Sequence, residues 1–257
     1  MVKKDLFDFT GRVAVVTGAS SGLGVQMAKA LARQGADLAI MARRKEKLET
    51  VAEEIRALSV RCLPVPCDVT DTGAVKNAAG IIEKEYGKVD ILINNAGNGH
   101  VGPALETSDE DWDFTVSLDL TSVFKVSREF ARIMVKNNYG RIINISSMYG
   151  LVGNMALPSS GYHAAKGGVI NLTRALAAEW APYGITVNGI CPGYFETELT
   201  VDTLKTEEFS QYMKATVPLG RYGNEGELDS AALFLASEAS SYVTGVSIPV
   251  DGGYTAV

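Results

Sequence analysis

Short apolar runs alternate with helix-length segments along this sequence, and this alternation constrains the fold more than any other feature. The runs have the character of strands that are buried on both faces of a sheet. They lie at residues 13–16, 38–41, 63–65, 89–93, 142–145, 185–187 and 246–248. The helix-length segments are 22–34, 45–58, 74–86, 109–137 and 162–181.

This order predicts an α/β fold, because strands that alternate with helices form βαβ units with parallel strands. We expect a Rossmann-like, doubly wound sheet of about seven parallel strands with helices on both faces. No linker or repeat interrupts the pattern, so residues 1–257 are predicted to form one domain. Segment 109–137 is long enough for two helices, or for one helix with a break.

Composition excludes several classes of function. The net charge is −6 without a long block of like charges, which argues against a nucleic-acid or membrane-surface protein. No apolar run reaches the length of a membrane span, and the first residues lack the apolar core of a signal peptide. Three cysteines outside any CxxC pattern and two histidines predict free buried thiols and no metal site. We therefore expect a soluble, cytoplasmic protein.

The first strand leads directly into the sequence TGASSGLG at residues 17–24. In a dinucleotide site Gly18 permits the tight turn, Gly22 lets the backbone approach a pyrophosphate, and Gly24 lets the helix pack closely on the strand. The N–H groups at the helix start would face the phosphates. An ordinary glycine-rich turn has similar spacing, but the strand before it and the helix after it favour a dinucleotide. The cofactor-binding residues predicted here are Gly18, Ser20, Ser21, Gly22, Leu23 and Gly24.

The end of the second strand indicates which dinucleotide is preferred. An acidic residue there would bind the ribose 2′-hydroxyl of NAD, but this chain has Arg43 and Arg44 instead. A guanidinium suits a 2′-phosphate, which a carboxylate would repel. Two solvated arginines at a helix start are the alternative interpretation. The sequence therefore favours NADP(H), with NAD(H) as the second choice.

Two further strand ends carry candidate cofactor residues. Asp68, followed by Val69, could accept a hydrogen bond from the adenine amine or could cap the next helix. The sequence NNAG at residues 94–97 ends the fourth strand, and its small residues leave room for a ribose, although it could also be a simple turn. We predict cofactor contacts from Asp68, Val69, Asn95, Ala96 and Gly97, with Asn94 beside them.

The chemical centre of the prediction is the pair Tyr162 and Lys166. If residues 162–181 form a helix, the two side chains lie one turn apart on the same face. An ammonium there favours the phenolate, so Tyr162 could exchange a proton with a carbonyl or an alcohol near neutral pH. A serine after the preceding strand could hydrogen-bond the same oxygen. An isolated pair of this kind is more often a surface Tyr and Lys, so the rest of the chain decides.

With these motifs in order, the chain resembles the short-chain dehydrogenase/reductase family over essentially its whole length. The matching segments are TGASSGLG (17–24), CDVTD (67–71), NNAG (94–97), GRIINISS (140–147), YHAAK (162–166), NGICPGYFET (188–197) and VDGG (250–253). Each segment alone is a weak signal, whereas all of them in this order are highly specific.

The resemblance implies reversible hydride transfer between a nicotinamide and a carbonyl/alcohol pair. It implies that Tyr162 is the general acid/base, that Lys166 assists it and holds the nicotinamide ribose, and that Ser147 orients the substrate oxygen. Thr197, after Pro192 and Gly193, would hold the carboxamide. The predicted cofactor-binding residues therefore also include Pro192, Gly193, Thr197, Tyr162 and Lys166.

The chain departs from the family pattern at two places. Asp119 stands where the family usually has an Asn that serves a proton relay behind the lysine. An ionised Asp accepts from the same ammonium but donates nothing, so a relay role is compatible but not secured. The spacing from Ser147 to Tyr162 is also longer than in many relatives, as it is in sugar and polyol reductases.

The resemblance is greatest to sugar-acid and polyol reductases of the gluconate 5-dehydrogenase type. The alternatives are a hydroxysteroid dehydrogenase, a 3-oxoacyl-thioester reductase and a non-catalytic dinucleotide-sensing protein. Residues 195–221 resemble the family's mobile substrate lid, and family habit implies a homotetramer or homodimer. The predicted pocket residues are His100, Met148, Tyr149, Met155, Leu157, His163 and Tyr194.

Overall fold

The structure, a computed structural model, describes residues 5–98, 101–155, 157–197 and 200–257. A single sheet runs through it, in the order β3-β2-β1-β4-β5-β6-β7, with every neighbouring pair parallel. The strands are β1 (Val13–Thr17), β2 (Asp37–Ala42), β3 (Cys62–Pro66), β4 (Ile91–Asn94), β5 (Gly140–Ile145), β6 (Ile185–Pro192) and β7 (Ser247–Val250). The predicted Rossmann-like sheet of about seven parallel strands is confirmed.

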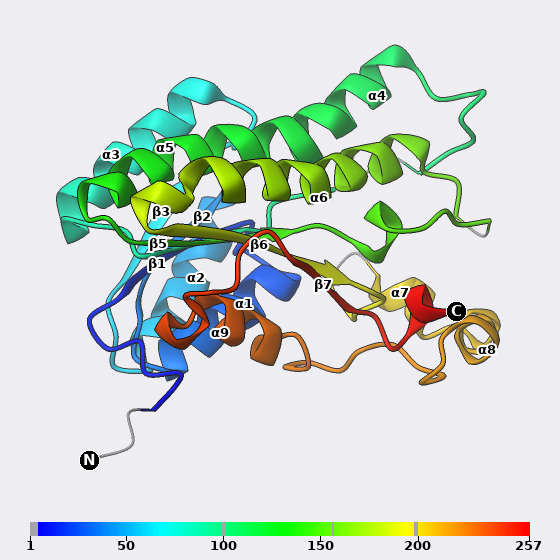
Figure 1. The fold of residues 1–257 in the computed structure, drawn as a ribbon. Helices are drawn as coiled ribbons and strands as arrows, with labels where there is room; N and C mark the ends of the chain where they lie inside the picture. The colour runs from blue at the N-terminus through cyan, green and yellow to red at the C-terminus, as the bar shows by residue number, and fades with distance from the viewer. Residues whose placement is uncertain (1–4, 99–100, 156, 198–199) are drawn as a thin grey trace.

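Helices cover both faces of the sheet (Figure 1). The α-helices are α1 (Gly22–Arg33), α2 (Lys45–Arg56), α3 (Thr72–Tyr86), α4 (Asp109–Val116), α5 (Ser122–Lys136), α6 (Ser160–Trp180), α7 (Val201–Leu204), α8 (Glu207–Thr216) and α9 (Asp229–Ala236). Helices α3, α5 and α6 pack on one face, and α1, α2 and α9 pack on the other. Short η helices lie at Met148–Gly150 (η2), Ala181–Tyr183 (η3), Glu238–Ser240 (η4) and Tyr254–Ala256 (η5).

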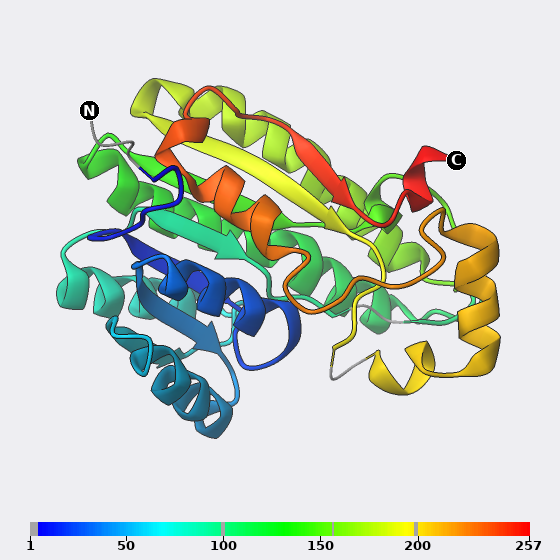
Figure 2. The same cartoon turned by 90° about the horizontal axis from the view of Figure 1, so that it is seen from below.

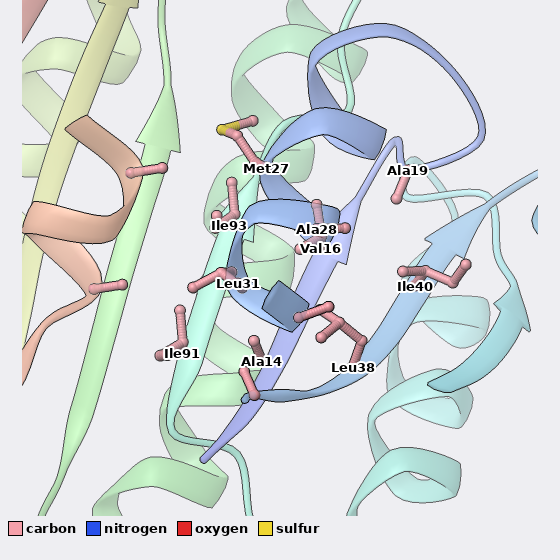
Figure 3. Close-up of a cluster of buried hydrophobic side chains, with 14 of the residues drawn as sticks. Ala14, Val16, Ala19, Met27, Ala28, Leu31, Leu38, Ile40, Ile91 and Ile93 are labelled. Carbon is pink, nitrogen blue, oxygen red and sulfur yellow. The ribbon is translucent and has the colours of Figure 1, made fainter. Parts of the chain in front are cut away.

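The core explains why the strand sequences are apolar at every position. Alternate residues of β1 point to opposite faces, so Ala14 and Val16 pack under α1 while Val15 packs toward α3 and α5. Figure 3 shows Met27, Ala28 and Leu31 of α1 against β1, β2 and β4. Met27 and Leu31 are fully buried, so the first βα unit holds the loop that follows β1 in a fixed position.

The long segment expected to contain two helices or a break contains a π-helical turn. Residues Ser117–Thr121 (η1) join α4 to α5 with a π-helix, and the two helices continue through it. A π-turn adds a residue to the helix and redirects the side chains around it, and such turns are frequent at functional sites. Asp119 lies in this turn and is fully buried.

Cys62, Cys67 and Cys191 are free and buried, as predicted, and burial raises the pKa of Cys62 to about 12 and those of Cys67 and Cys191 to about 11. Across the described ranges, no helix is long and apolar enough to cross a membrane. Within the same ranges no group of three or more His, Cys, Asp or Glu side chains could hold a metal ion.

Candidate active site

A cavity of about 620 Å³ opens where the carboxyl ends of β1, β4, β5 and β6 meet. In doubly wound sheets this edge, near the point where strand order reverses, is where ligands bind. One side of the cavity is lined by the loop after β1 and the end of β4. The other side is lined by the segments after β5 and β6.

The loop after β1 has the glycine geometry that the sequence predicts. Gly18 and Gly22 have φ values of +66° and +59°, in the left-handed region that favours glycine. A Cβ on Gly24 would lie 2.6 Å from the carbonyl oxygen of Gly18, so only glycine lets α1 pack this closely. Ser21, the N-cap residue, makes no side-chain hydrogen bond to the first turn of α1, and that turn carries no acidic residue. The members of this loop that line the cavity are Gly18, Ser21, Gly22 and Leu23.

The two arginines after β2 lie in different environments. Arg44 extends across the glycine loop and donates to Ser20 Oγ at 3.1 Å and to Ser21 Oγ at 2.8 Å. Arg43 is exposed, and its charge acts on Asp68. Burial would raise the pKa of Asp68, but two hydrogen bonds from Thr70 and the charge of Arg43 hold that pKa below its usual value.

Asp68 and Val69 follow β3, beside β2 and its arginines, and neither is among the residues that line the cavity. Val69 is buried in the core, and Asp68 is bonded to Thr70 within its own turn. The cap of α3 is a different residue, Asp71, which accepts from the N–H groups of Gly73 and Ala74.

Hydrogen bonds from the NNAG segment connect the start of the glycine loop to the end of β4. Asn95 donates through Nδ2 to the carbonyl of Thr17 at 3.1 Å, and Thr17 Oγ1 accepts from the N–H groups of Asn95 and Ala96. Asn95, Ala96 and Gly97 line the cavity. Asn94 does not, because its side chain points into the sheet interior and donates to Ser127 and Asn144.

Lys166 is the most tightly held charged group of the site. Its Nζ lies 3.0 Å from Asp119 Oδ1 and 3.2 Å from the carbonyl of Ile145, and 5.4 Å from the ring centroid of Tyr162. Burial acts to lower the pKa of Lys166, but Tyr162 and Asp119 outweigh it and raise the pKa above its ordinary value. Lys166 therefore remains a cation beneath the Tyr162 ring.

Gly97 has a second role at this point. A Cβ there would lie 2.5 Å from Asp119 Oδ1 and 3.1 Å from Lys166 Nζ. The π-turn brings Asp119 so close to the end of β4 that any side chain at position 97 would displace the ion pair. The backbone N–H of Asn98 also donates to Asp119 Oδ2 at 3.3 Å.

Two serines follow β5 and differ in their contacts. Ser146 Oγ donates to the carbonyl of Lys166 at 2.8 Å and so attaches α6 to the sheet. Ser147 caps η2, where its Oγ accepts from the N–H of Tyr149 at 3.1 Å. Ser147, Tyr162 and Lys166 all line the same cavity.

The predicted carboxamide residues also line the cavity. Gly193 packs so closely on the backbone of Asp251 that a Cβ would lie 2.6 Å from Asp251 Cα. Thr197 faces the glycine loop, 3.3 Å from the Cβ position of Gly22, and its Oγ1 lies 3.0 Å from Thr200 Oγ1. Pro192 completes this group at the end of β6.

The pocket residues expected from the sequence are only partly correct. Met148, Tyr149, Leu157 and Tyr194 line the cavity. Met155 is fully exposed and does not, and His163 lies behind Tyr149, with ring centroids 4.8 Å apart. His100 lies outside the described residues. Three further lining residues were not singled out from the sequence: Asn98, Val101 and Ser159. Four more lie within the segment 195–221 that was expected to form the lid: Phe195, Thr200, Leu204 and Phe209.

Comparisons with known proteins agree with this geometry. A family model described as enoyl-(acyl carrier protein) reductase matches residues 18–255. Gluconate 5-dehydrogenase of Gluconobacter oxydans (strain 621H) is 41% identical over 256 residues, covering 99% of each chain. Galactitol 2-dehydrogenase (L-tagatose-forming) of Cereibacter sphaeroides is 42% identical over 253 residues, covering 98% of each.

A solved structure is also similar to this chain over almost its whole length. The crystal structure of a gluconate 5-dehydrogenase from Burkholderia cenocepacia J2315, in complex with NADP and tartrate, has a TM-score of 0.94 and 38% identity, covering 98% of each chain. With this fold, this cavity and relatives that cover almost its full length, the chain belongs to the short-chain dehydrogenase/reductase family of NAD(P)-dependent oxidoreductases.

Proposed function

We propose that this protein catalyses NADP(H)-dependent, reversible interconversion of a carbonyl and a secondary alcohol on a keto-sugar acid or a polyol. The observation that carries the proposal is the buried Lys166–Asp119 pair beneath Tyr162, with Tyr162 and Lys166 lining the same cavity as the glycine loop. The relatives named for gluconate and galactitol support the substrate class.

The residues of the cavity fit a bound dinucleotide. At four positions a Cβ atom would lie close to neighbouring protein atoms: Gly18, Gly22, Gly97 and Gly193. These positions favour glycine, so a ligand beside them would meet backbone instead of side chains. The N-terminus of α1 offers N–H groups and a positive dipole for a pyrophosphate. The cofactor-binding residues we propose here are Gly18, Ser20, Ser21, Gly22, Leu23, Gly24, Asn95, Ala96, Gly97, Pro192, Gly193 and Thr197.

The charges beside this loop favour NADP(H). Arg44 lies on the two loop serines, and exposed Arg43 follows the end of β2, where a carboxylate would select NAD. Two guanidinium groups can each bind a phosphate through charge-assisted hydrogen bonds. We assign Arg43 and Arg44 to the 2′-phosphate and the neighbouring turn of Asp68 and Val69 to the adenine.

The catalytic roles follow from the contacts. The bound nicotinamide supplies or receives the hydride. Tyr162 gives a proton to the substrate oxygen during reduction, and the Lys166 ammonium stabilises the phenolate that remains. Ser147 donates a hydrogen bond to the same oxygen. Asp119 acts through Lys166, because it pairs with the ammonium and does not itself line the cavity.

We propose that residues 1–257 act as one unit, with residues 195–221 as a substrate lid. The short helix α7 and the amphipathic helix α8 lie in this segment, and Leu204 and Phe209 face the cavity. We further propose a cytoplasmic homo-oligomer, a tetramer or a dimer. The large apolar side chains of Trp112, Phe114 and Phe124, which remain exposed on α4 and α5, support an interface there.

A hydrophobic ketone is the second candidate substrate. Val101, Met148, Leu157, Leu204 and Phe209 all face the cavity and would suit a steroid or an acyl chain.

The experiment is NADPH oxidation at 340 nm with 5-keto-gluconate, L-tagatose, a ketosteroid and acetoacetyl thioester. Saturable turnover of either sugar derivative supports the proposal, and turnover of only the steroid or the thioester contradicts it.

A further inference from the structure

A chain of polar groups crosses the cavity wall formed after β5 and β6. Asn154 Nδ2 donates to the hydroxyl of Tyr149 at 2.5 Å, and that hydroxyl lies 2.5 Å from the hydroxyl of Tyr194. The hydroxyl of Tyr194 lies 3.5 Å from that of Tyr212, which lies 3.4 Å from that of Tyr254. The chain joins the loop after η2 to α8 and to the C-terminal η5, which lie side by side in Figures 1 and 2.

The Tyr149–Tyr194 pair has two hydroxyl hydrogens, and one of them remains available to a ligand. Each phenol has one O–H, and a single hydrogen occupies the short contact between the two oxygens. Asn154 is a donor to the pair and accepts nothing from it in this contact. If Tyr149 donates to Tyr194, the second hydrogen is on Tyr194 and has only the Tyr212 oxygen at 3.5 Å, the outer limit of a hydrogen bond. If Tyr194 donates to Tyr149, the second hydrogen is on Tyr149, whose contact with Asn154 is one in which Asn154 donates. This result does not depend on which phenol donates to the other.

Both phenols are held in position and face the reacting groups. Tyr149 and Tyr194 line the cavity together with Ser147 and Tyr162. The Tyr149 ring stacks on His163 at 4.8 Å, and His163 is held by Ser159 through Nδ1. The Tyr194 ring meets Phe209 edge to face, with centroids 5.0 Å apart.

The pair also remains protonated over the working range of pH. Burial raises the pKa of Tyr149 to about 12, and burial together with its tyrosine neighbours raises that of Tyr194 as well. Both groups are therefore neutral hydrogen-bond donors.

We propose that the Tyr149–Tyr194 pair determines specificity by donating its spare O–H to a substrate hydroxyl beyond the reacting carbon. This inference rests on the proposed function, because it identifies what recognises the polyhydroxylated part of the substrate. The longer spacing between Ser147 and Tyr162 contributes to the site, because the loop in that interval supplies Asn154 and is tied to Gly102 through the Pro158 carbonyl at 2.9 Å.

The test compares two ketones in the variants Y149F, Y194F and Y149F/Y194F. One ketone is polyhydroxylated, either 5-keto-gluconate or L-tagatose, and the other is 2-hexanone, which lacks hydroxyl groups. Each single variant keeps one O–H in the pair, so we expect kcat/KM for the polyhydroxylated ketone to fall about threefold relative to 2-hexanone. The double variant keeps none, and we expect a relative loss of about tenfold or more, the size of a lost neutral hydrogen bond.

The matched control is Y212F, which removes a hydroxyl from the same cluster but outside the cavity wall. It should leave the ratio between the two ketones unchanged. Equal loss for both ketones in the double variant, or no loss, would overturn the inference while the proposed function stands. Failure of the wild type to reduce either polyhydroxylated ketone would instead reject both. If the double variant does not fold, as judged by circular dichroism, the ratios of the two single variants against Y212F decide the question.

Discussion

The cavity wall formed by β1, α1 and the end of β4 is built from glycine and backbone, whereas the wall formed after β5 and β6 is built from aromatic side chains. On the first wall a Cβ at Gly18 or Gly97 would collide with neighbouring atoms. On the second wall Tyr149, Tyr194 and Phe209 are fixed by ring contacts and a hydroxyl pair. The first wall suits a ligand that is the same in many enzymes, and the second can change with the substrate.

The two walls meet at Tyr162 and Lys166, so the largest effect is expected there. Y162F removes the proposed proton donor and should lower kcat about 10²- to 10⁴-fold. The dissociation constant of NADPH, measured by fluorescence titration, should stay within about twofold, because the glycine wall is unchanged. Y183F, at an exposed tyrosine that does not line the cavity, is the control and should keep normal turnover. Normal turnover by Y162F would disprove the assignment.

Substitution of Gly97 tests whether the glycine wall tolerates a side chain at this position. In G97A the new Cβ would lie 2.5 Å from Asp119 Oδ1, so the Asp119–Lys166 pair has to move. Displacement of a catalytic group by about 1 Å can cost on the order of 10²-fold, and we expect a loss of kcat/KM of that order. G80A is the matched control, because a Cβ at Gly80 meets nothing within 4 Å, and activity there should be unchanged. Equal activity in G97A and G80A would contradict the argument.

The preference for NADPH over NADH tests the role proposed for Arg43, which follows β2 beside the glycine loop. R43A should raise the KM for NADPH about tenfold or more, as expected for loss of a hydrogen bond to a charged group. The KM for NADH should change by less than about twofold, because NADH has no 2′-phosphate. Steady-state kinetics with both cofactors on one preparation provides the internal control. A parallel loss with NADH would reject the role of Arg43.

The smallest effect on rate is expected at Asp119, which acts only through Lys166. Asp119 helps to raise the pKa of Lys166 against burial, so D119N should lower that pKa. The ammonium is then lost at lower pH, and the alkaline limb of the kcat/KM profile should move to lower pH. At neutral pH we expect a loss of only a few-fold in turnover. Complete loss would show that the carboxylate charge is required, and an unchanged profile would show that the pair is not coupled.

The same comparison explains which features could be predicted from the sequence. Glycine positions are dictated by backbone sterics within a few residues, so the loop after β1 and the NNAG turn were readable from local spacing. The strands were readable because burial on both faces leaves continuous apolar runs.

Tyr149 and Tyr194 were expected in the pocket, but the contacts that build the aromatic wall could not be predicted in the same way. Tyr149, Tyr194 and Tyr254 come from segments far apart in the chain, and their contacts depend on rotamers and on the fold of α8. Asn94, expected beside the cofactor but turned into the sheet, and the π-turn around Asp119 illustrate the same limit. Their neighbours in space are set by helix register and strand pairing, which a one-dimensional pattern does not specify.

A crystal structure of the complex with NADP⁺ tests the central claim most directly, because it shows both walls with their ligand. We predict the pyrophosphate on the backbone of residues 18–22 and the 2′-phosphate within hydrogen-bond distance of Arg43 or Arg44. The nicotinamide should lie beside Tyr162 and Lys166, facing the Tyr149–Tyr194 wall. A 2′-phosphate directed away from both arginines, or a dinucleotide bound outside this cavity, would contradict the account.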